Sequence, residues 1–577
     1  MKVLEGTVAS AGLVRGTAVV VNQAKYELSG IQADSPDEEL SKLTAALQTS
    51  LEELIEVKER MREEMGEESA HIFRAQQTIL EDESIIEEIR NAVESEKISA
   101  VEAVNNVFST YLQMFEELGE DDYNKARMTD LADVQKRVVR NILGEGETDL
   151  SSLGDSSIVV AEELFPSETA GMNVSEVIGM VTEKGGLTSH VAILARNRGI
   201  PALVGVKDAT SELDDGETVW IDATNSEKGV LYASPDDETE HKLDVARNRE
   251  HVRQETLARE KFLSPVTTDG HVLTLSANVG TADEIPHTRE FGATSVGLFR
   301  TEFLFMNRSV LPDEETQYAA YKEVAGAFSD GFVILRTIDV GGDKPVKSIS
   351  IPEEKNPFLG YRGVRISLDV HSILRDQLRA AFRASAHGPM KIMFPMISGP
   401  NEMKQLVPVV KEIREELDSG GFAFDPDVEI GIMIEVPSAV FMARELAGMA
   451  DFASIGTNDL TQYLLAADRM NEKVGDYYQP YHPSVFRAIK HVVDAFHNEG
   501  KWVGICGELG GMAPAIPALV GLGVDELSMN APALSEATYV IRRVSKATAE
   551  NVAAEVLAAD EEHEVKRILR EVRIPEE

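Results

Sequence analysis

The sequence predicts a multidomain α/β protein with an all-α insertion and a C-terminal (β/α)8 barrel. The chain has 577 residues, which at about 150 residues per domain corresponds to three or four domains. Residues 36–143 carry helical patterns, while the sequence before and after them is rich in short strands. From residue 272 onward, apolar strand-like runs alternate with helical stretches.

The C-terminal alternation contains eight apolar runs, which in order are VLTLSAN, TSVGLF, FVILRTID, KIMFPMI, IGIMIEV, FASIG, WVGIC and DELSMN. Eight strands that alternate with helices over about 300 residues are typical of a (β/α)8 barrel. The alternative is an open doubly wound sheet. The count of eight favours the barrel, whose chemistry would lie at the carboxyl ends of the strands.

The N-terminal part begins with two predicted strands around a glycine turn in residues 1–22. A helix is expected to start at Ser35-Pro36, because serine caps helices and proline suits the first turn. Further helical patterns over 69–96, 98–118 and 122–143 indicate a bundle of antiparallel helices. Amphipathic faces normally form a core, although a module inserted in this way could also dock a partner. Leucines recur at helical spacing along the first helix, at Leu40, Leu43, Leu47, Leu51 and Leu54.

Strand-like sequence returns from residue 157, with glycine and proline punctuation, in SIVVAEEL, VIGMVTEKGG, PALVG and ETVWIDATNSEKGVLYA. Together with residues 1–22 these segments predict a compact α/β domain that the helical module interrupts. Residues 236–262 are charged almost throughout, which indicates an exposed connecting helix. The predicted domains are therefore an α/β domain (1–22 and 144–233), a helical domain (23–143), a linker helix (234–262) and the barrel (263–577).

Acidic residues dominate the charge of an otherwise ordinary composition. Apolar residues make up 43% of the chain, and 99 Asp and Glu against 56 Lys and Arg give a net charge of −43. This charge argues against nucleic acid and anionic membranes as partners, and it means that an anionic substrate needs a locally basic pocket. One hypothesis is adaptation to a high-salt cytosol, where salt screens the repulsion between carboxylates. The alternative is a very acidic mesophilic protein.

The sequence also predicts a cytoplasmic location. No apolar run approaches the roughly 18 residues of a membrane span, and the N-terminus is interrupted by Glu5 and Arg15, unlike a signal peptide. The single cysteine, Cys506, leaves no intrachain disulfide and fits a reducing compartment.

Arginines and carboxylates stand at the predicted strand ends. Glu435 and Asp459 end successive strands, and two such oxygen ligands suit Mg²⁺, which usually keeps waters and substrate phosphate in its shell. Arg300, Arg336 and, beyond Asp459, Arg469 could converge on a dianion, because arginine offers phosphate a planar fork of donors. One arginine alone would more often be a surface ion pair, but the whole set favours a phosphate site.

Two further residues could take part in chemistry. Cys506 lies at a strand end in the glycine-rich segment WVGICGELGG, where it is either inert packing or a proton donor. His190 lies in GGLTSHVAILAR, after Thr188 and Ser189 at an expected helix start, where free N–H groups favour anions. It is either a nucleophile that holds phosphate or a capping or core histidine.

These motifs carry a family resemblance. GGLTSHVAILAR resembles the phosphohistidine motif of enzyme I of the phosphoenolpyruvate–sugar phosphotransferase system, and GTVASAGLVRGTA is similar to its N-terminal strand pair. The resemblance covers essentially the whole chain in order. The segments that resemble the phosphoenolpyruvate-binding barrel of that family are GLFRTEFLFMNR, LRTIDVGGDKP, NPFLGYRGVRI, IGIMIEVPSA, FASIGTNDLTQYLLAADR and VGICGELGG.

The resemblance implies a reaction and its partners. Phosphoenolpyruvate, bound with Mg²⁺ in the barrel, would phosphorylate His190 and leave as pyruvate, and the phosphoryl group would pass to a histidine of the carrier protein HPr. The α/β domain would then be a swivelling phosphohistidine domain, the helical domain would dock HPr, and the barrel would form a homodimer.

The resemblance also implies roles for individual residues. Glu435 and Asp459 would bind Mg²⁺, Cys506 would protonate the enolate, and Thr169 would hydrogen-bond the active histidine. Contacts with phosphoenolpyruvate are implied for Arg300, Arg336, Asn458, Asp459 and Arg469, with Arg362 as a further contact.

One departure from the family lies in the helical module, where Gln76 in IFRAQQTILEDES stands at a position expected to be histidine. This puts details of carrier docking in doubt. One alternative function is that of phosphoenolpyruvate synthase or a pyruvate phosphate dikinase, but no stretch supplies the nucleotide-binding domain these enzymes need. The other is a non-catalytic regulatory relative, against which the intact His190, Glu435, Asp459 and Cys506 argue.

Overall fold

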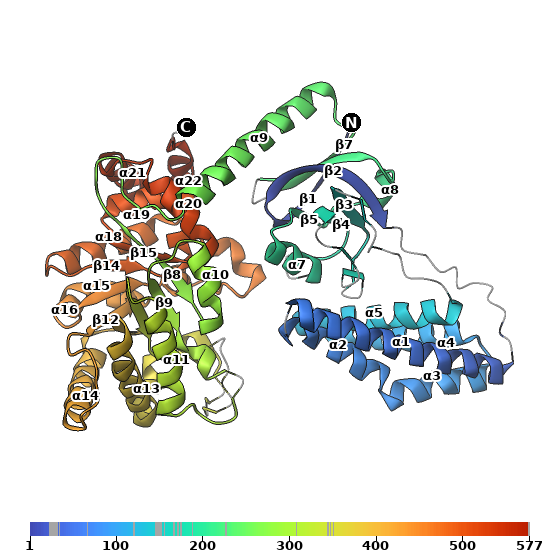
Figure 1. Ribbon diagram of the computed structural model, residues 1–577, viewed down its shortest axis with the longest axis horizontal. Coiled ribbons are helices and arrows are strands. Elements are labelled where there is room, and N and C mark those ends of the chain that lie inside the picture. The colour runs from blue at the N-terminus through green and yellow to red at the C-terminus, as the bar shows by residue number, and fades with distance from the viewer. Residues whose placement is uncertain are drawn as a thin grey trace. The chain divides into compact units, whose positions relative to one another are not determined.

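The computed structural model consists of two compact units, residues Met1–Val252 and Arg253–Glu577 (Figure 1). For some helical residues the description is of the backbone alone: 60–65, 67–72, 116–118, 122–126, 190, 193, 197 and 472. The structure describes the chain apart from residues 22–32, 34, 66, 119–121, 145–149, 151–152, 155, 166–167, 170–171, 174–175, 187–188, 225–227, 307, 343–345, 347, 350, 353 and 575–577.

Strands from both ends of the first unit form one closed sheet. The N-terminal strand β2 pairs in parallel with β3, with Val19 opposite Val159, and β1 pairs antiparallel with β7. The order around the sheet is β1-β5-β4-β3-β2-β6-β7. Helices α7 (His190–Arg198) and α8 (Ala209–Glu212) belong to the same unit. The strands are β1 (Lys2–Ser10), β2 (Gly12–Val21), β3 (Ser157–Ala161), β4 (Val177–Thr182), β5 (Ala202–Val204), β6 (Thr218–Ala223) and β7 (Gly229–Ala233).

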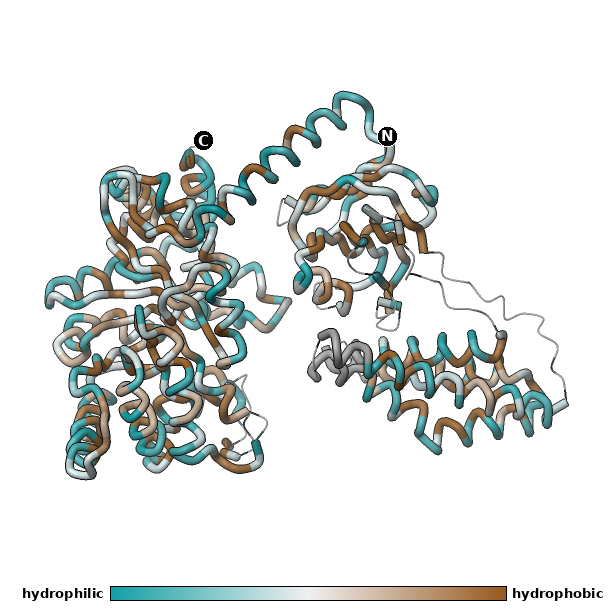
Figure 2. Tube along the Cα trace, in the orientation of Figure 1, coloured by the Kyte–Doolittle hydropathy of each residue, from teal (hydrophilic) through white to brown (hydrophobic). Residues whose placement is uncertain are grey.

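Five helices between β2 and β3 bury their apolar stripes against one another, and the brown and teal bands of Figure 2 follow these stripes. The first begins at Pro36, as predicted, and the Ser35 hydroxyl accepts a hydrogen bond from the Glu38 N–H at 3.4 Å. The helical pattern predicted over 69–96 is present but divides into two helices, because Asp82 caps a new helix by accepting from the Ser84 N–H at 2.8 Å. The helices are α1 (Pro36–Met65), α2 (Glu67–Leu80), α3 (Glu83–Glu96), α4 (Ala100–Leu118) and α5 (Asp122–Leu143).

A long helix, α9 (Asp237–Glu260), begins in the first unit and ends in the second. Half of its residues are charged, and its two leucines are anchors, whereas Val245 and Val252 are exposed. Leu243 packs with Trp220 in the first unit, and Leu257 belongs to the core of the second. The sequence prediction of a connecting helix is confirmed at the level of secondary structure.

The second unit is a closed barrel of eight parallel strands in the order β10-β11-β12-β13-β14-β15-β8-β9, as the eight apolar runs predicted. The strands are β8 (Thr274–Val279), β9 (Val296–Arg300), β10 (Val333–Arg336), β11 (Met390–Phe394), β12 (Glu429–Ile434), β13 (Phe452–Ile455), β14 (Val503–Ile505) and β15 (Glu526–Met529). The helices are α10 (Ile285–Glu290), α11 (Glu314–Ala327), α12 (Val364–Asp369), α13 (His371–Ala384), α14 (Pro400–Ser419), α15 (Pro437–Phe441), α16 (Ala443–Ala447), α17 (Thr457–Leu465), α18 (Pro483–His497), α19 (Ile516–Leu522), α20 (Ala531–Ile541), α21 (Lys546–Ala558) and α22 (Glu562–Glu571).

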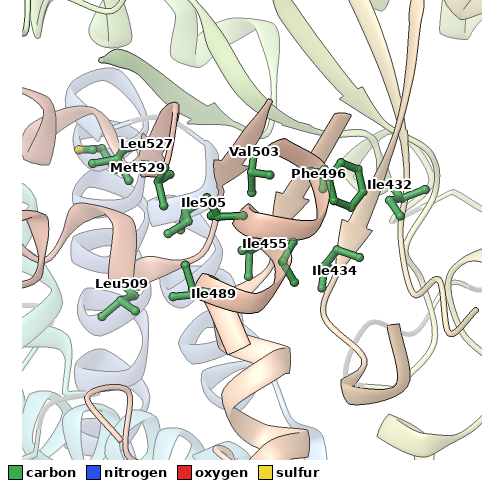
Figure 3. Close-up of a cluster of buried hydrophobic side chains, with 14 of the residues drawn as sticks. Ile432, Ile434, Ile455, Ile489, Phe496, Val503, Ile505, Leu509, Leu527 and Met529 are labelled. Atoms are coloured by element: carbon green, nitrogen blue, oxygen red, sulfur yellow. The ribbon is translucent and has the colours of Figure 1, made fainter. Parts of the chain in front are cut away.

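Strand residues of the barrel alternate between an apolar outer face and a mixed inner face. Figure 3 shows outward residues such as Ile455, Val503 and Leu527 in one buried cluster with Ile489 and Phe496 of α18. Because successive strand residues point to opposite faces, their neighbours point into the barrel. Those neighbours include Ser454, Gly504, Cys506, Glu526 and Ser528.

Among the residues that the structure describes, no helix is long and apolar enough to span a membrane.

Candidate active site at the carboxyl end of the barrel

Two buried arginines share one carboxylate where β10 ends. Arg336 is the last residue of β10, and its guanidinium lies 3.3 Å from Asp339 Oδ2 and 2.5 Å from Glu302 Oε1. Arg362 donates to the same Asp339 oxygen at 3.1 Å. Arg336, Arg362 and Asp339 are 5%, 1% and 1% exposed. Because both arginines are paired on the protein side, their planes are fixed before any ligand arrives.

A second carboxylate continues this chain of ion pairs. Asp459, in the first turn of α17, lies 3.3 Å from Arg362 Nη1 and 3.4 Å from Arg469 Nη1. Burial alone would lower the pKa of Arg362, but Asp339 and Asp459 outweigh burial and raise it. The structure therefore brings together four predicted site residues, namely Arg336, Arg362, Asp459 and Arg469.

Glu435 follows β12 and is 1% exposed. Its Oε1 accepts a hydrogen bond from the Met396 N–H at 2.6 Å, and the absence of a side chain at Gly456 leaves room for its Oε2. Burial first, and then the nearby charges of Asp459 and Asp339, raise the pKa of Glu435 to about 8, against the opposing effect of Arg362 and Arg336. The Glu435 and Asp459 carboxylates are thus close enough to repel each other.

The closeness of the Glu435 and Asp459 carboxylates bears on whether this site suits a metal ion. Among the described residues, no three or more His, Cys, Asp or Glu side chains form a group that could hold a metal. Two carboxylates that repel each other across a buried site would be stabilised by a divalent cation. Mg²⁺ suits such a pair, since one or two protein carboxylates, waters and substrate phosphate complete its shell. Glu435 and Asp459 therefore fit Mg²⁺ rather than a metal that needs an all-protein cage.

Two further predicted residues line the strand ends. Arg300 ends β9, is half-buried, and lies with its guanidinium over the Phe303 ring, 5.3 Å from the centroid. Asn458 precedes Asp459 and binds Glu508 twice: its Oδ1 accepts from the Glu508 N–H at 2.9 Å, and its Nδ2 donates to Glu508 Oε1 at 3.0 Å. Asn458 is thereby tied to the segment that follows Cys506.

Cys506 is the residue after β14 and is 4% exposed. Its thiol points toward the Ile455 carbonyl at 3.8 Å. Burial raises the pKa of Cys506 to about 12; Ser454 and Arg336 act in the opposite direction. At neutral pH the group is therefore a thiol, which suits a proton donor and not a thiolate nucleophile.

The remaining predicted residues belong to the first unit. His190 is the first residue of α7, and the Ser189 hydroxyl caps this helix by accepting from the Ala192 N–H at 3.3 Å. The side chain of His190 and all of Thr188 lie outside the described part of the structure. Thr169 is 5% exposed, and its hydroxyl donates to the Phe165 carbonyl at 3.3 Å.

Sequence reasoning overlooked Glu302 and undervalued Asp339. Each follows a predicted arginine by two or three residues, which was the available signal. The charge count led us to expect a basic pocket, but Arg336, Arg362 and Arg469 are each paired with a carboxylate. The positive charge of the site is therefore more closely balanced than the sequence suggested.

Gln76 lies in the core of the helical bundle and is fully buried. Its Nε2 donates to Asp133 Oδ2 at 3.0 Å and lies 3.5 Å from Asp130 Oδ1. Burial raises the pKa of Asp130 to about 6, while Arg127 and Gln76 oppose the rise. Gln76 thus joins α2 to α5, and its effect on carrier docking stays a prediction.

Known proteins match this chain over nearly its whole length. Three family profiles match: the N-terminal domain of phosphoenolpyruvate-utilising enzymes at residues 5–127, their mobile domain at 153–226 and their phosphoenolpyruvate-binding domain at 254–546. The chain is 40% identical over 571 residues to the phosphoenolpyruvate-protein phosphotransferase of Bacillus subtilis, which covers 99% of this chain and 100% of the relative. The Haemophilus influenzae enzyme of the same name is 40% identical over 570 residues, 98% of each chain. An NMR solution structure of an enzyme I protein is 34% identical, covers 43% of this chain and 99% of its own, and has a TM-score of 0.35.

Proposed function

The chain belongs to the phosphoenolpyruvate-protein phosphotransferase family, and from this premise we propose which of its residues carry the reaction. The protein is an enzyme of phosphoenolpyruvate-dependent phosphoryl transfer. The observation that carries the proposal is the chain of buried ion pairs from Arg336 to Arg469, which meets two mutually repelling carboxylates and a buried thiol at the strand ends.

The arginines bind phosphoenolpyruvate. Arg300, Arg336, Arg362 and Arg469 present guanidinium groups at or near the strand ends, and guanidinium matches carboxylate and phosphate with paired donors. Because Glu302, Asp339 and Asp459 hold three of them in place, little reorganisation accompanies substrate binding. Asn458 supports the same end of the barrel through Glu508.

Glu435 and Asp459 would hold Mg²⁺, which when bound would supply positive charge against the oxygens of the transferring phosphoryl group. Burial first, and then Asp459 and Asp339, raise the pKa of Glu435, and a cation bound there would favour its ionised form. Asp459 remains paired with Arg362 and Arg469, so the protein fixes this ligand from two sides.

His190 accepts the phosphoryl group. The ester P–O bond of phosphoenolpyruvate breaks as an N–P bond to the imidazole forms, and a neutral imidazole at pH 7 has the lone pair this requires. The position at the start of α7 supports the role, because free N–H groups at a helix start favour a phosphate. Thr169 orients His190. HPr docks on the helical domain, and the α/β domain swivels on the linker so that the phosphoryl group passes from His190 to a histidine of HPr.

Cys506 completes the formation of pyruvate. Loss of the phosphoryl group leaves an enolate, and the S–H proton moves to its methylene carbon. A thiol whose pKa burial has raised to about 12 is protonated at working pH and is a weak enough acid not to ionise beforehand.

We also propose that the enzyme works in the cytoplasm as a dimer formed through the barrel, and that its acidic surface reflects a saline cytosol. Activity and stability that rise with molar KCl would support the last point, and their absence would refute it.

Incubation with radiolabelled phosphoenolpyruvate and Mg²⁺, without nucleotide, tests the assignment. We expect acid-labile, base-stable label on the protein, no label on His190→Ala, and discharge of the label by HPr. Label that survives His190→Ala would refute the role of His190. A requirement for ATP or AMP would indicate a dikinase, and no labelling at all a non-catalytic relative.

A further inference from the structure

The barrel interior holds a buried carboxyl group that the mechanism above does not use. Glu526 opens β15 and is 1% exposed. Neither of its carboxyl oxygens has a hydrogen-bond partner among the described residues. An ionised carboxylate in such surroundings would lose its hydration without compensation, so the neutral acid is favoured. Burial accordingly raises the pKa of Glu526 to about 8, and the nearby Ser276 hydroxyl, which is not in hydrogen-bonding geometry, offsets part of the rise.

Two glycines make room for this carboxyl group. Gly504 pairs in register with Glu526 on the neighbouring strand β14, and a Cβ atom at Gly504 would lie 2.2 Å from Glu526 Oε2. On β9, a Cβ atom at Gly297 would lie 2.1 Å from Glu526 Oε1. A side chain at either position would collide with the carboxyl group. The Glu526 side chain therefore lies over the backbone of Gly504.

The Glu526 carboxyl group lies on the inner face of the barrel, next to Cys506 on the side of the amino ends of the strands. Gly504 and Cys506 point to the same inner face of the barrel and are two residues apart, or about 6.6 Å along the strand. Ser454 pairs in register with Gly504 from the other side. Its buried hydroxyl has no hydrogen-bond partner of normal geometry among the described residues, and it is near enough to the thiol to lower the pKa of Cys506. The other ionisable groups that face the thiol are Arg336 from β10 and Glu435 after β12.

We propose that Glu526 returns a proton to Cys506 after each turnover, with the Ser454 hydroxyl as the relay. The inference rests on the proposed role of Cys506. Once the S–H proton has gone to the enolate carbon, Cys506 is a thiolate. The Ser454 O–H proton moves to sulfur and the Glu526 O–H proton moves to the Ser454 oxygen, which restores thiol and hydroxyl and leaves the charge on the Glu526 carboxylate. Water at the mouth of the barrel resupplies the proton through the same groups after pyruvate leaves.

The direction of this transfer follows from the two environments. The pKa of Cys506 is about 12 and that of Glu526 about 8, so a proton moves spontaneously from the acid to the thiolate. The relay acts while substrate excludes water from the mouth, when Glu435, the other carboxyl group that faces the thiol, would be ionised as a ligand of Mg²⁺. Glu526 acts through Cys506 and does not touch the substrate.

The test is Glu526→Gln in the full-length protein, assayed for pyruvate formation with phosphoenolpyruvate, Mg²⁺ and HPr. Glutamine keeps the size and the neutral charge of the protonated acid but has no acidic proton. We expect kcat to fall at least tenfold with an unchanged melting temperature, and Glu526→Asp to recover part of the rate. A purely structural role would be satisfied by glutamine, so wild-type turnover of Glu526→Gln would overturn the proposal. A loss of rate together with a lower melting temperature, not relieved by aspartate, would overturn it as well.

Two further variants separate this inference from the proposed function. Glu429→Gln removes a carboxylate that is paired with Lys391 at the opposite end of the barrel, and we expect wild-type turnover. Cys506→Ser should lose turnover. If Cys506→Ser is fully active, the role of Cys506 fails; if it is inactive while Glu526→Gln is fully active, only the role of Glu526 fails.

Discussion

The two ends of the barrel hold their charged groups in different ways. At the carboxyl end, arginines and carboxylates fix one another in a chain that runs from Glu302 through Arg336 and Asp339 to Arg362 and Asp459. At the amino end, one ion pair is surrounded by aromatic rings. Lys391 pairs with Glu429 and lies over the rings of Phe332, Phe452 and Trp502, and the last two rings stack with centroids 4.5 Å apart.

This difference separates chemistry from stability within one fold. At the amino end Lys391 has its ionic partner within the protein and is packed against aromatic rings. At the carboxyl end Glu435 is buried beside Asp459 and Asp339, which raises its pKa, and a bound cation would favour its ionised form. Active sites of (β/α)8 barrels lie at the carboxyl end, while the opposite end supports stability.

The largest expected effect is on stability at the amino end. Phe452 is fully buried, and its truncation in Phe452→Ala should lower the free energy of unfolding by about 3–5 kcal/mol. We expect kcat per folded molecule to stay at the wild-type value. Urea unfolding gives the change in stability, and kcat is measured at urea concentrations well below the unfolding transition. If Phe452→Ala has wild-type stability but loses turnover, the assignment of stability to the amino end and chemistry to the carboxyl end is wrong.

At the carboxyl end the expected effect is on the reaction. Glu435→Gln keeps an oxygen acceptor for the Met396 N–H but removes the charge that would bind Mg²⁺. We expect the rate of His190 phosphorylation to fall by a factor of about 10²–10³, or roughly 2.7–4 kcal/mol. The melting temperature should not fall, because burial and the neighbouring carboxylates already favour the uncharged form of Glu435, which glutamine resembles. A large loss of stability with normal phosphorylation would place Glu435 among the structural residues.

Glu526 lies between the two ends of the barrel, and its raised pKa leads us to expect that the free energy of unfolding depends on pH. Its pKa is about 8 in the folded protein against 4.5 without the fold, so between these pH values the folded state binds more protons. The free energy of unfolding should therefore fall as pH rises through this window, by up to about 1.4 kcal/mol per pH unit from this group. Urea titrations across the window should give a shallower slope for Glu526→Gln, and equal slopes would mean that Glu526 is ionised in the folded protein.

Much of the fold followed from local patterns in the sequence. The eight apolar runs became the eight barrel strands, because strand length and apolar content are properties of short segments. The start at Pro36 and the cap at Ser189 were also local. The helical pattern over 69–96 divides into two helices for a local reason as well, because Asp82 caps the second helix.

Pairings between distant residues could not be obtained in this way. Arg362 meets Asp459 across 97 positions of sequence and Arg336 meets Glu302 across 34, so their partnership depends on strand order and register. Glu526 in DELSMN was only part of a predicted strand. Its burial, and the room that Gly504 and Gly297 leave for it, exist only once the barrel has closed.

The sequence by itself determined the family, the number of barrel strands and the strand ends where arginines and carboxylates gather, since those depend on residue types and short-range spacing. The tertiary structure alone decided how these charges are balanced. Barrel closure buries Asp339, Asp459 and Glu435 close to one another. Because little solvent is left to screen their charges, the ion pairs and repulsions among these groups and the arginines are strong. These interactions decide which groups the protein fixes and which are left to bind a ligand.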